Sequence, residues 1–150
     1  MLRRELLLPD PAATEQLGAA LARLMRTRSG GLVALRGDLG AGKTSLARAC
    51  LRHLGVTGAI KSPSYTLVEP YAIQGINVLH MDLYRLTEPE ELYGLGVFDE
   101  APPLAWWLVE WPENAGALLP PASLQIDLSH QLSGRLATLQ AVDAEFLLTD

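Results

Sequence analysis

The chain has 150 residues, of which 49% are hydrophobic and 19% are charged, and its net charge is −5. This composition excludes a disordered chain, and the apolar runs are too short for a signal peptide or a membrane span, so we expect one globular domain over residues 1–150. The only cysteine, Cys50, excludes an internal disulfide framework and favours a cytoplasmic location.

The N-terminal segment predicts a short edge strand followed by an amphipathic helix. The strand is Leu6-Leu7-Leu8. Asp10 followed by Pro11 is typical of a helix start, because an Asp side chain caps free N–H groups and proline fits the first turn. Apolar residues at helical spacing continue from Ala13 to about Met25, which predicts a helix with one buried face.

Residues 37–44 read Gly-Asp-Leu-Gly-Ala-Gly-Lys-Thr and match the pattern G-x-x-x-x-G-K-[ST] of a phosphate-binding loop. An apolar strand over residues 31–36 precedes the loop, and a helix over residues 45–54 follows it and ends at Gly55. This strand–loop–helix context is the one that the motif requires. The glycines allow successive N–H groups to face one anion, and the helix adds its positive N-terminal end. A chance glycine-rich turn would not be expected to match every fixed position.

We therefore expect this loop to bind the phosphates of a nucleotide. Lys43 would reach the β- and γ-phosphates, and the Thr44 hydroxyl would hold Mg²⁺. The predicted cofactor-binding residues are Asp38, Leu39, Gly40, Ala41, Gly42, Lys43, Thr44 and Ser45.

Residues 61–66 are rich in hydroxyl groups and contain a central proline, so they predict a loop. This loop is either an ordinary connection or a switch loop that brings a Ser or Thr hydroxyl to the γ-phosphate and Mg²⁺.

Two antiparallel strands are expected over residues 66–71 and 76–82, joined by a short turn at Gln74-Gly75. The second strand ends in Asp82. A carboxylate at the C-terminal end of a strand beside a phosphate loop is where a second magnesium ligand belongs, so we expect Asp82 to be that ligand. The three histidines are interpreted as structural, although His80 lies on the same strand face as Asp82.

Residues 87–90 match a capping box and predict the start of a short helix. A buried strand over residues 105–110 then ends in Glu110, which repeats the pattern seen at Asp82. Glu110 is a candidate for orienting or activating water and for joining the metal site, and a capping or salt-bridging glutamate is the alternative. Trp111 follows this acid and is a candidate site residue, whereas the preceding tryptophans are expected in the core.

The last part of the chain predicts a β-hairpin. Residues 124–128 alternate between apolar and polar, which is typical of a half-buried strand. A turn is expected over residues 130–134 and a partner strand over residues 135–142, and residues 145–150 are expected to fray.

The predicted fold class is α/β, with a P-loop NTPase-like three-layer arrangement and a central, mostly parallel sheet that carries antiparallel additions. The sequence has no N-K-x-D motif for guanine and no D-x-x-G after the candidate metal strand. Only Arg85 and Arg135 supply basic side chains after residue 75, which argues against the arginine-rich lid of a small-molecule kinase. A small ATPase is the class that remains.

Five stretches resemble the bacterial TsaE (YjeE) family of ATPases, in that family's order and over about residues 6–140. They are residues 39–44, residues 62–71, His80-Met81-Asp82-Leu83-Tyr84-Arg85-Leu86, residues 89–96 and Leu108-Val109-Glu110-Trp111-Pro112. Many families share the phosphate loop, whereas the combination of H-x-D-x-Y-R with V-E-W is far more specific.

The resemblance implies a cofactor of ATP with Mg²⁺ and a role in threonylcarbamoylation of the tRNA adenosine beside the anticodon. It also implies that the protein works with TsaD and TsaB and reaches tRNA through that complex. Because the sequence shows no obvious arginine finger and no substrate domain, we expect a weak intrinsic ATPase whose hydrolysis is coupled to that complex. Residue by residue, the resemblance implies Asp82 as the metal-site acid, Ser64 with Thr66 in the switch loop, and Glu110-Trp111 in the late motif. Ser64 stands where threonine is expected in many members, which keeps the hydroxyl and loses a methyl group.

Two other functions stay open at this stage. One is an assembly switch that is gated by nucleotide and in which hydrolysis is incidental. The other is a phosphotransferase that acts on a small molecule.

Overall fold

The computed structural model describes residues 1–100 and 104–148. Within these residues the strands form one seven-stranded sheet in the order β1-β7-β6-β2-β5-β4-β3. The strand bounds are β1 Leu2–Leu8, β2 Gly31–Arg36, β3 Val68–Ile73, β4 Ile76–Asp82, β5 Trp106–Glu110, β6 Leu124–Gln131 and β7 Gly134–Ala141. The four central strands β6, β2, β5 and β4 are parallel, while β7, β1 and β3 are antiparallel additions at the two sides.

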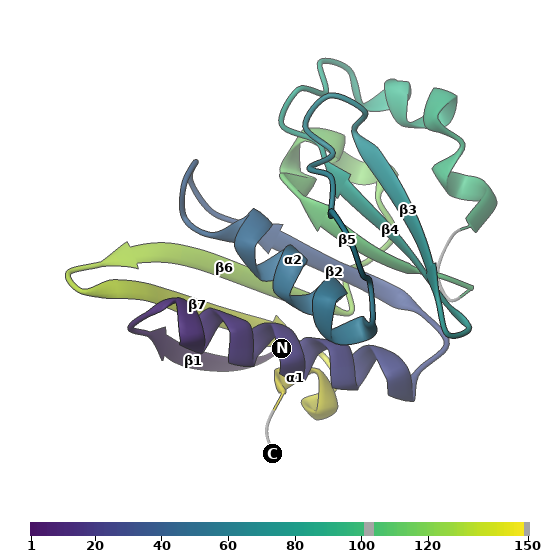
Figure 1. Ribbon diagram of the computed structural model, residues 1–150. Helices are drawn as coiled ribbons and strands as arrows, with labels where there is room; N and C mark the ends of the chain where they lie inside the picture. The colour runs from purple at the N-terminus through teal and green to yellow at the C-terminus, as the bar shows by residue number, and fades with distance from the viewer. Residues whose placement is uncertain (101–103, 149–150) are drawn as a thin grey trace.

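Helices α1 (Pro11–Thr27) and α2 (Lys43–Leu54) lie side by side on one face of the sheet (Figure 1). The opposite face of β2, β4 and β5 is covered by short 3-10 segments, η1 (Pro89–Leu95), η2 (Val97–Glu100) and η3 (Pro112–Leu118). Each face has its own apolar cluster, because successive side chains of a strand point to opposite faces. The predicted three-layer α/β class is confirmed, with one outer layer built from 3-10 turns. No helix among the described residues is long and apolar enough to cross a membrane.

The elements around the phosphate loop follow their local sequence signals. Strand β2 covers the predicted residues 31–36, and helix α2 starts at Lys43, two residues before the predicted start. The Asp10 carboxylate caps α1 by accepting a hydrogen bond of 2.9 Å from the Ala13 N–H. Gly55 ends α2 with φ +114°, and its N–H donates back to the Arg52 carbonyl.

Other elements also differ from the predictions, and strand β3, for example, runs from Val68 to Ile73 instead of over residues 66–71. The capping box at residues 87–90 is not formed, because the Thr87 hydroxyl donates to Glu91 at 2.6 Å, and the segment that follows is a 3-10 helix from Pro89 to Leu95. Strand β1 starts at Leu2, because it pairs with β7 along its full length. His130 was expected in a turn but pairs with Arg135 in the ladder between β6 and β7.

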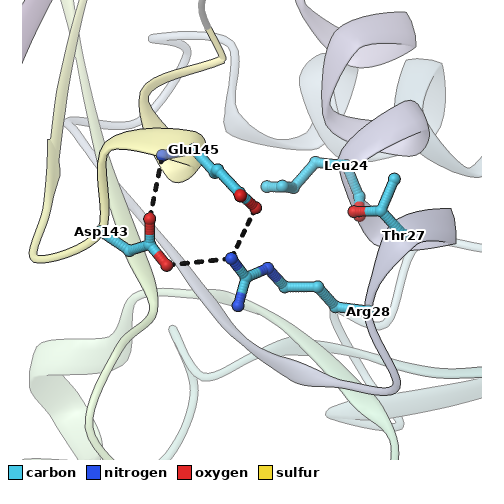
Figure 2. Close-up of polar contacts among 5 residues, drawn as sticks. All are labelled: Leu24, Thr27, Arg28, Asp143 and Glu145. Atoms are coloured by element: carbon cyan, nitrogen blue, oxygen red, sulfur yellow. Dashed lines mark hydrogen bonds and ion pairs between the residues drawn. The ribbon is translucent and has the colours of Figure 1, made fainter.

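The expected fraying of residues 145–148 is wrong. Segment η4 (Ala144–Leu147) buries Phe146, and Arg28 pairs with the carboxylates of Asp143 and Glu145 at 2.9 and 2.6 Å (Figure 2). The Arg28 guanidinium also lies 4.7 Å from the centre of the Phe146 ring. These contacts attach the segment to the end of α1, and the rest of the predicted frayed end, residues 149–150, lies outside the described residues.

Candidate functional site

The candidate site lies where three parallel strands end at the same edge of the sheet. Strand β2 leads into the phosphate loop, β4 ends in Asp82 and β5 ends in Glu110. Asp82 and Glu110 are direct neighbours in the ladder between β4 and β5, and Leu35 is the neighbour of Glu110 on the other side. The carboxyl edge of a parallel sheet is the usual place for a ligand.

A pocket of about 390 Å³ occupies this edge. Its walls come from the phosphate loop and from four other parts of the chain. The lining residues are Leu39, Gly40, Ala41, Gly42, Lys43, Thr44, Ser45, Ser64, Asp82, Tyr84, Arg85, Glu110, Trp111 and Arg135.

The conformation of the phosphate loop requires glycine at its two ends. Gly37 has φ +147°, and a Cβ there would lie 2.5 Å from the Leu128 carbonyl oxygen. Gly42 has φ +109° and is the N-cap of α2. Because glycine has no side chain that could cap the helix, the first N–H groups of α2 are free to bind a ligand in the pocket. Of the predicted cofactor-binding residues, Leu39 to Ser45 line the pocket, whereas Asp38 contributes through its backbone, which accepts from Lys43 Nζ at 3.1 Å.

Lys43 is buried under the indole of Trp111. Its Nζ lies 4.0 Å from the ring centre of Trp111 and donates to the carbonyl oxygens of Gly37 and Asp38. Burial lowers the pKa of Lys43, and the nearby negative charge of Glu110 opposes that shift. Trp111 has φ +58°, in the left-handed region, and its ring also contacts Tyr84 at 5.0 Å between ring centres.

Glu110 connects the sheet to the phosphate loop. Its side chain is buried, at 2% exposure, and its Oε1 accepts a hydrogen bond of 2.7 Å from the Thr44 hydroxyl. Its Oε2 lies 2.7 Å from His80 Nε2. The predicted candidate Glu110 is therefore in direct contact with the predicted candidate Thr44.

Asp82 lies beside Glu110 and faces the hydroxyl-rich loop. Its Oδ2 accepts from the Ser64 hydroxyl at 3.4 Å, and its Oδ1 accepts from the Tyr84 N–H at 3.1 Å. Burial raises the pKa of Asp82, the charge of Glu110 raises it further, and the hydrogen bond from Tyr84 works in the opposite direction.

The two candidate hydroxyls of the loop over residues 61–66 have different surroundings. Ser64 lines the pocket, whereas the Thr66 hydroxyl donates to Glu69 at 3.1 Å and lies outside the pocket lining. The structure thus brings Ser64 together with the other candidates and leaves Thr66 apart from them.

The sequence reasoning missed several pocket residues. Arg135 comes from β7, donates to the Gly40 carbonyl at 3.4 Å and lies so close to Gly42 that a Cβ there would be 2.7 Å from its Nη1. Arg85 also lines the pocket, and its guanidinium lies 4.5 Å from the ring centre of Tyr65. Among lysines and arginines, these two are the only ones after residue 75, and that isolation was the available signal.

The strand order, the phosphate loop and the acids at two neighbouring strand ends place the chain in the P-loop class of α/β proteins. A family model described as "Threonylcarbamoyl adenosine biosynthesis protein TsaE" matches residues 8–137. The chain therefore belongs to the TsaE family, whose members serve tRNA threonylcarbamoyladenosine biosynthesis, and the resemblance inferred from the sequence is confirmed.

Individual relatives agree with this assignment. The chain is 40% identical over 126 residues to the TsaE protein of Haemophilus influenzae, an alignment that covers 82% of this chain and 80% of the relative. It is 45% identical over 113 residues to the TsaE protein of Synechocystis sp., covering 73% and 71% of the two chains. The crystal structure of Bacillus subtilis YdiB superimposes with a TM-score of 0.75 at 26% identity, covering 98% of this chain and 91% of that one.

Proposed function

We propose that this protein binds ATP with Mg²⁺ and hydrolyses it in support of threonylcarbamoylation of tRNA. The observation that carries the proposal is the contact between Thr44 and Glu110, beside Asp82, at the end of the phosphate loop. The role in tRNA modification rests on membership of the TsaE family.

The phosphate loop and Lys43 would bind the triphosphate. The free N–H groups at the start of α2 and the positive end of that helix favour an anion at this position. Lys43 now donates to two carbonyl oxygens of its own loop, and a β- or γ-phosphate oxygen would replace them with a charge-assisted hydrogen bond.

The oxygen donors around the pocket fit a magnesium ion. The Thr44 hydroxyl and the carboxylates of Asp82 and Glu110 are the ligand types that Mg²⁺ prefers, and Mg²⁺ usually shares a protein site with substrate phosphates. When bound, the ion would neutralise charge that develops on the phosphate oxygens. Glu110 would orient the attacking water. The Ser64 hydroxyl, which contacts Asp82, would reach the γ-phosphate. The products would be ADP and inorganic phosphate.

The base would bind beyond Arg135. A second pocket of about 270 Å³ shares Arg135 with the phosphate pocket and lies against Pro9, Thr14 and His130. Its position next to the phosphate loop supports it as the place of the base, and the missing guanine motif supports adenine.

Partner dependence is supported by what surrounds the pocket. Leu39 in the phosphate loop and Tyr65 in the hydroxyl-rich loop are 64% and 83% exposed, so both are available for contact with a partner protein. We infer that TsaD and TsaB, in the cytoplasm, act together with the chain, raise its weak intrinsic turnover and connect it to tRNA.

The test compares a hydrolysable nucleotide with a tight-binding, non-hydrolysable one in a reconstituted tRNA-modification assay. We expect repeated rounds of modification only with ATP, together with free phosphate. Repeated rounds with the analogue would contradict the proposal and favour the assembly switch. Phosphate on an added small molecule, with no free phosphate, would favour a phosphotransferase.

A further inference from the structure

His80 is a buried polar residue that the phosphate chemistry above does not use. It lies on β4 with 0% exposure, and its Nε2 is 2.7 Å from Glu110 Oε2. Its other ring nitrogen, Nδ1, is also buried and has no hydrogen-bond partner among the described residues.

The register of the sheet explains why His80 reaches Glu110. His80 and Asp82 are two residues apart on β4, so their side chains point to the same face, and Asp82 is paired with Glu110 on β5. The carboxylate of Glu110 is therefore held from both sides. One oxygen contacts His80 inside the sheet, and the other contacts Thr44 on the phosphate loop.

Packing alone gives no reason for an imidazole at this position. A buried polar atom without a hydrogen bond is unfavourable, and an apolar side chain would avoid that cost at Nδ1. The neighbours of His80 on the same face of the sheet, Val78 on β4 and Leu108 on β5, are both buried and apolar. The polar contact that His80 does make is directed at Glu110 alone.

We propose that His80 is a positioning residue for Glu110: its Nε2–H holds one carboxylate oxygen so that the other faces Thr44 and the magnesium-bound nucleotide. This inference rests on the proposed function for the identity of the ligand. It places a ring proton on Nε2, since a carboxylate accepts. Removing a partner that orients a metal ligand in this way typically lowers metal affinity or activity by about 10- to 100-fold.

Two substitutions separate the hydrogen bond from the bulk of the side chain. In His80→Gln, the amide N–H lies near the position of Nε2 and can still donate to Glu110. In His80→Asn, the amide is one methylene shorter and corresponds to Nδ1, so it does not reach Glu110. Both variants bury a polar amide, so a loss that is specific to His80→Asn reports the contact rather than the change in polarity.

The first readout is the gain in affinity for a non-hydrolysable ATP analogue when Mg²⁺ is added, measured by titration calorimetry. We expect His80→Asn to reduce this gain about tenfold and His80→Gln to keep most of it. In a Glu110→Gln background the two His80 variants should be equal, because the carboxylate that they position is gone. The proposal would be overturned if Mg²⁺ raised the affinity of His80→Asn as much as that of the wild type. It would also be overturned if His80→Asn and His80→Gln still differed by the same amount in the Glu110→Gln background.

The second readout uses only the wild type and Glu110→Gln without nucleotide, so it does not depend on whether the His80 variants fold. The chain has three histidines, so an imidazole N–H that exchanges slowly with solvent is readily assigned by NMR. We expect one such proton, on Nε2 of His80, and we expect it to exchange faster and to shift in Glu110→Gln. If the wild type lacks this proton, or if Glu110→Gln leaves it unchanged, the positioning role is wrong.

The two readouts also distinguish this inference from the proposed function. A wild type that has the protected imidazole proton but neither binds the analogue nor releases phosphate would contradict the proposed function and keep the contact. A wild type that hydrolyses Mg-ATP while His80→Asn behaves identically would keep the function and remove the role of His80.

Discussion

Thr44 and Glu110 are 66 residues apart in the chain, yet the Thr44 hydroxyl donates a hydrogen bond of 2.7 Å to Glu110 Oε1. This bond joins the first turn of α2 to the end of β5. The bond therefore fixes the position of Thr44, at the end of the phosphate loop, relative to the acid at the end of a distant strand.

Removing Lys43 or Asp82 should abolish nucleotide turnover. We expect Lys43→Ala and Asp82→Ala each to lower phosphate release from Mg-ATP by about 100-fold, because each removes a group that stabilises phosphate charge or holds the metal. Phosphate release is measured with and without the partner complex. Arg23→Ala, which removes an exposed cation from α1, is the control and should behave as wild type. Wild-type turnover in both site variants would rule out the assignment of the site.

Glu110→Gln should separate binding from hydrolysis. The amide keeps the shape of the side chain and can still contact Thr44, but it orients and activates water poorly, so we expect turnover to fall by about 100-fold or more. Affinity for nucleotide without Mg²⁺ should stay near the wild-type value. Calorimetry and single-turnover kinetics measure the two quantities, and an unchanged rate would show that Glu110 has no role in the chemistry.

Ser64 and Thr66 should differ in their importance. The Ser64 hydroxyl lines the pocket and contacts Asp82, whereas the Thr66 hydroxyl is directed at Glu69. We expect Ser64→Ala to lower turnover clearly and Thr66→Val to have little effect on it, because Thr66→Val keeps the branched shape of the side chain. Steady-state kinetics of the pair decide the matter, and a larger loss in Thr66→Val would mean that the loop rearranges when nucleotide binds.

When no ligand is bound, the ionised side chain of Asp82 should lower the free energy of unfolding at neutral pH. Burial raises its pKa above the ordinary value of 3.8, so between 3.8 and the raised pKa the folded protein binds a proton that the unfolded chain does not. The contribution of Asp82 to the unfolding free energy therefore decreases as pH rises through that window and stays lower above it. We expect Asp82→Asn to raise the melting temperature at pH 7 and to lose this advantage below pH 4.

The same variant should lose the stabilisation that Mg-ATP gives to the wild type. Melting curves at several pH values, with and without Mg-ATP, measure both effects. A lower melting temperature of Asp82→Asn at pH 7 would contradict the cost of burying this charge.

The aromatic ring of Trp111, which covers Lys43, should contribute both to stability and to nucleotide binding. Trp111→Phe keeps an aromatic face over Lys43 and should cost about 1 kcal/mol of stability while leaving nucleotide binding intact. Trp111→Ala uncovers Lys43 and should weaken binding as well. Denaturant unfolding and calorimetry measure the two effects, and equal binding by Trp111→Ala and wild type would leave the ring a purely structural role.

The sequence predicts the parts of the fold that depend on local patterns. The phosphate loop with strand 31–36, the N-cap at Asp10 and the hairpin of β3 and β4 all follow from residues close to one another in the chain. The acids at strand ends were also predicted, because a carboxylate after an apolar strand is a local pattern and parallel strands end at one edge.

The features that were missed depend on long-range contacts. Arg135 reaches the phosphate loop only because β7 pairs with β6 and β6 pairs with β2. The C-terminal segment is ordered by Arg28, on the far end of α1, and no pattern within residues 143–148 shows that partner. His80 was interpreted as structural because its contact with Glu110 depends on the register between two strands.

Strand β1 pairs with β7, although residues 9–133 lie between the two strands in the chain. Residues 2–8 therefore leave the ribosome long before residues 135–141 can form hydrogen bonds with them. The same strand carries Arg135, which reaches Gly40 once β7 has paired with β6, so the candidate site acquires this basic group only after β7 has been made. The strand that brings Arg135 to the candidate site is thus also the strand that pairs with β1 at the edge of the sheet.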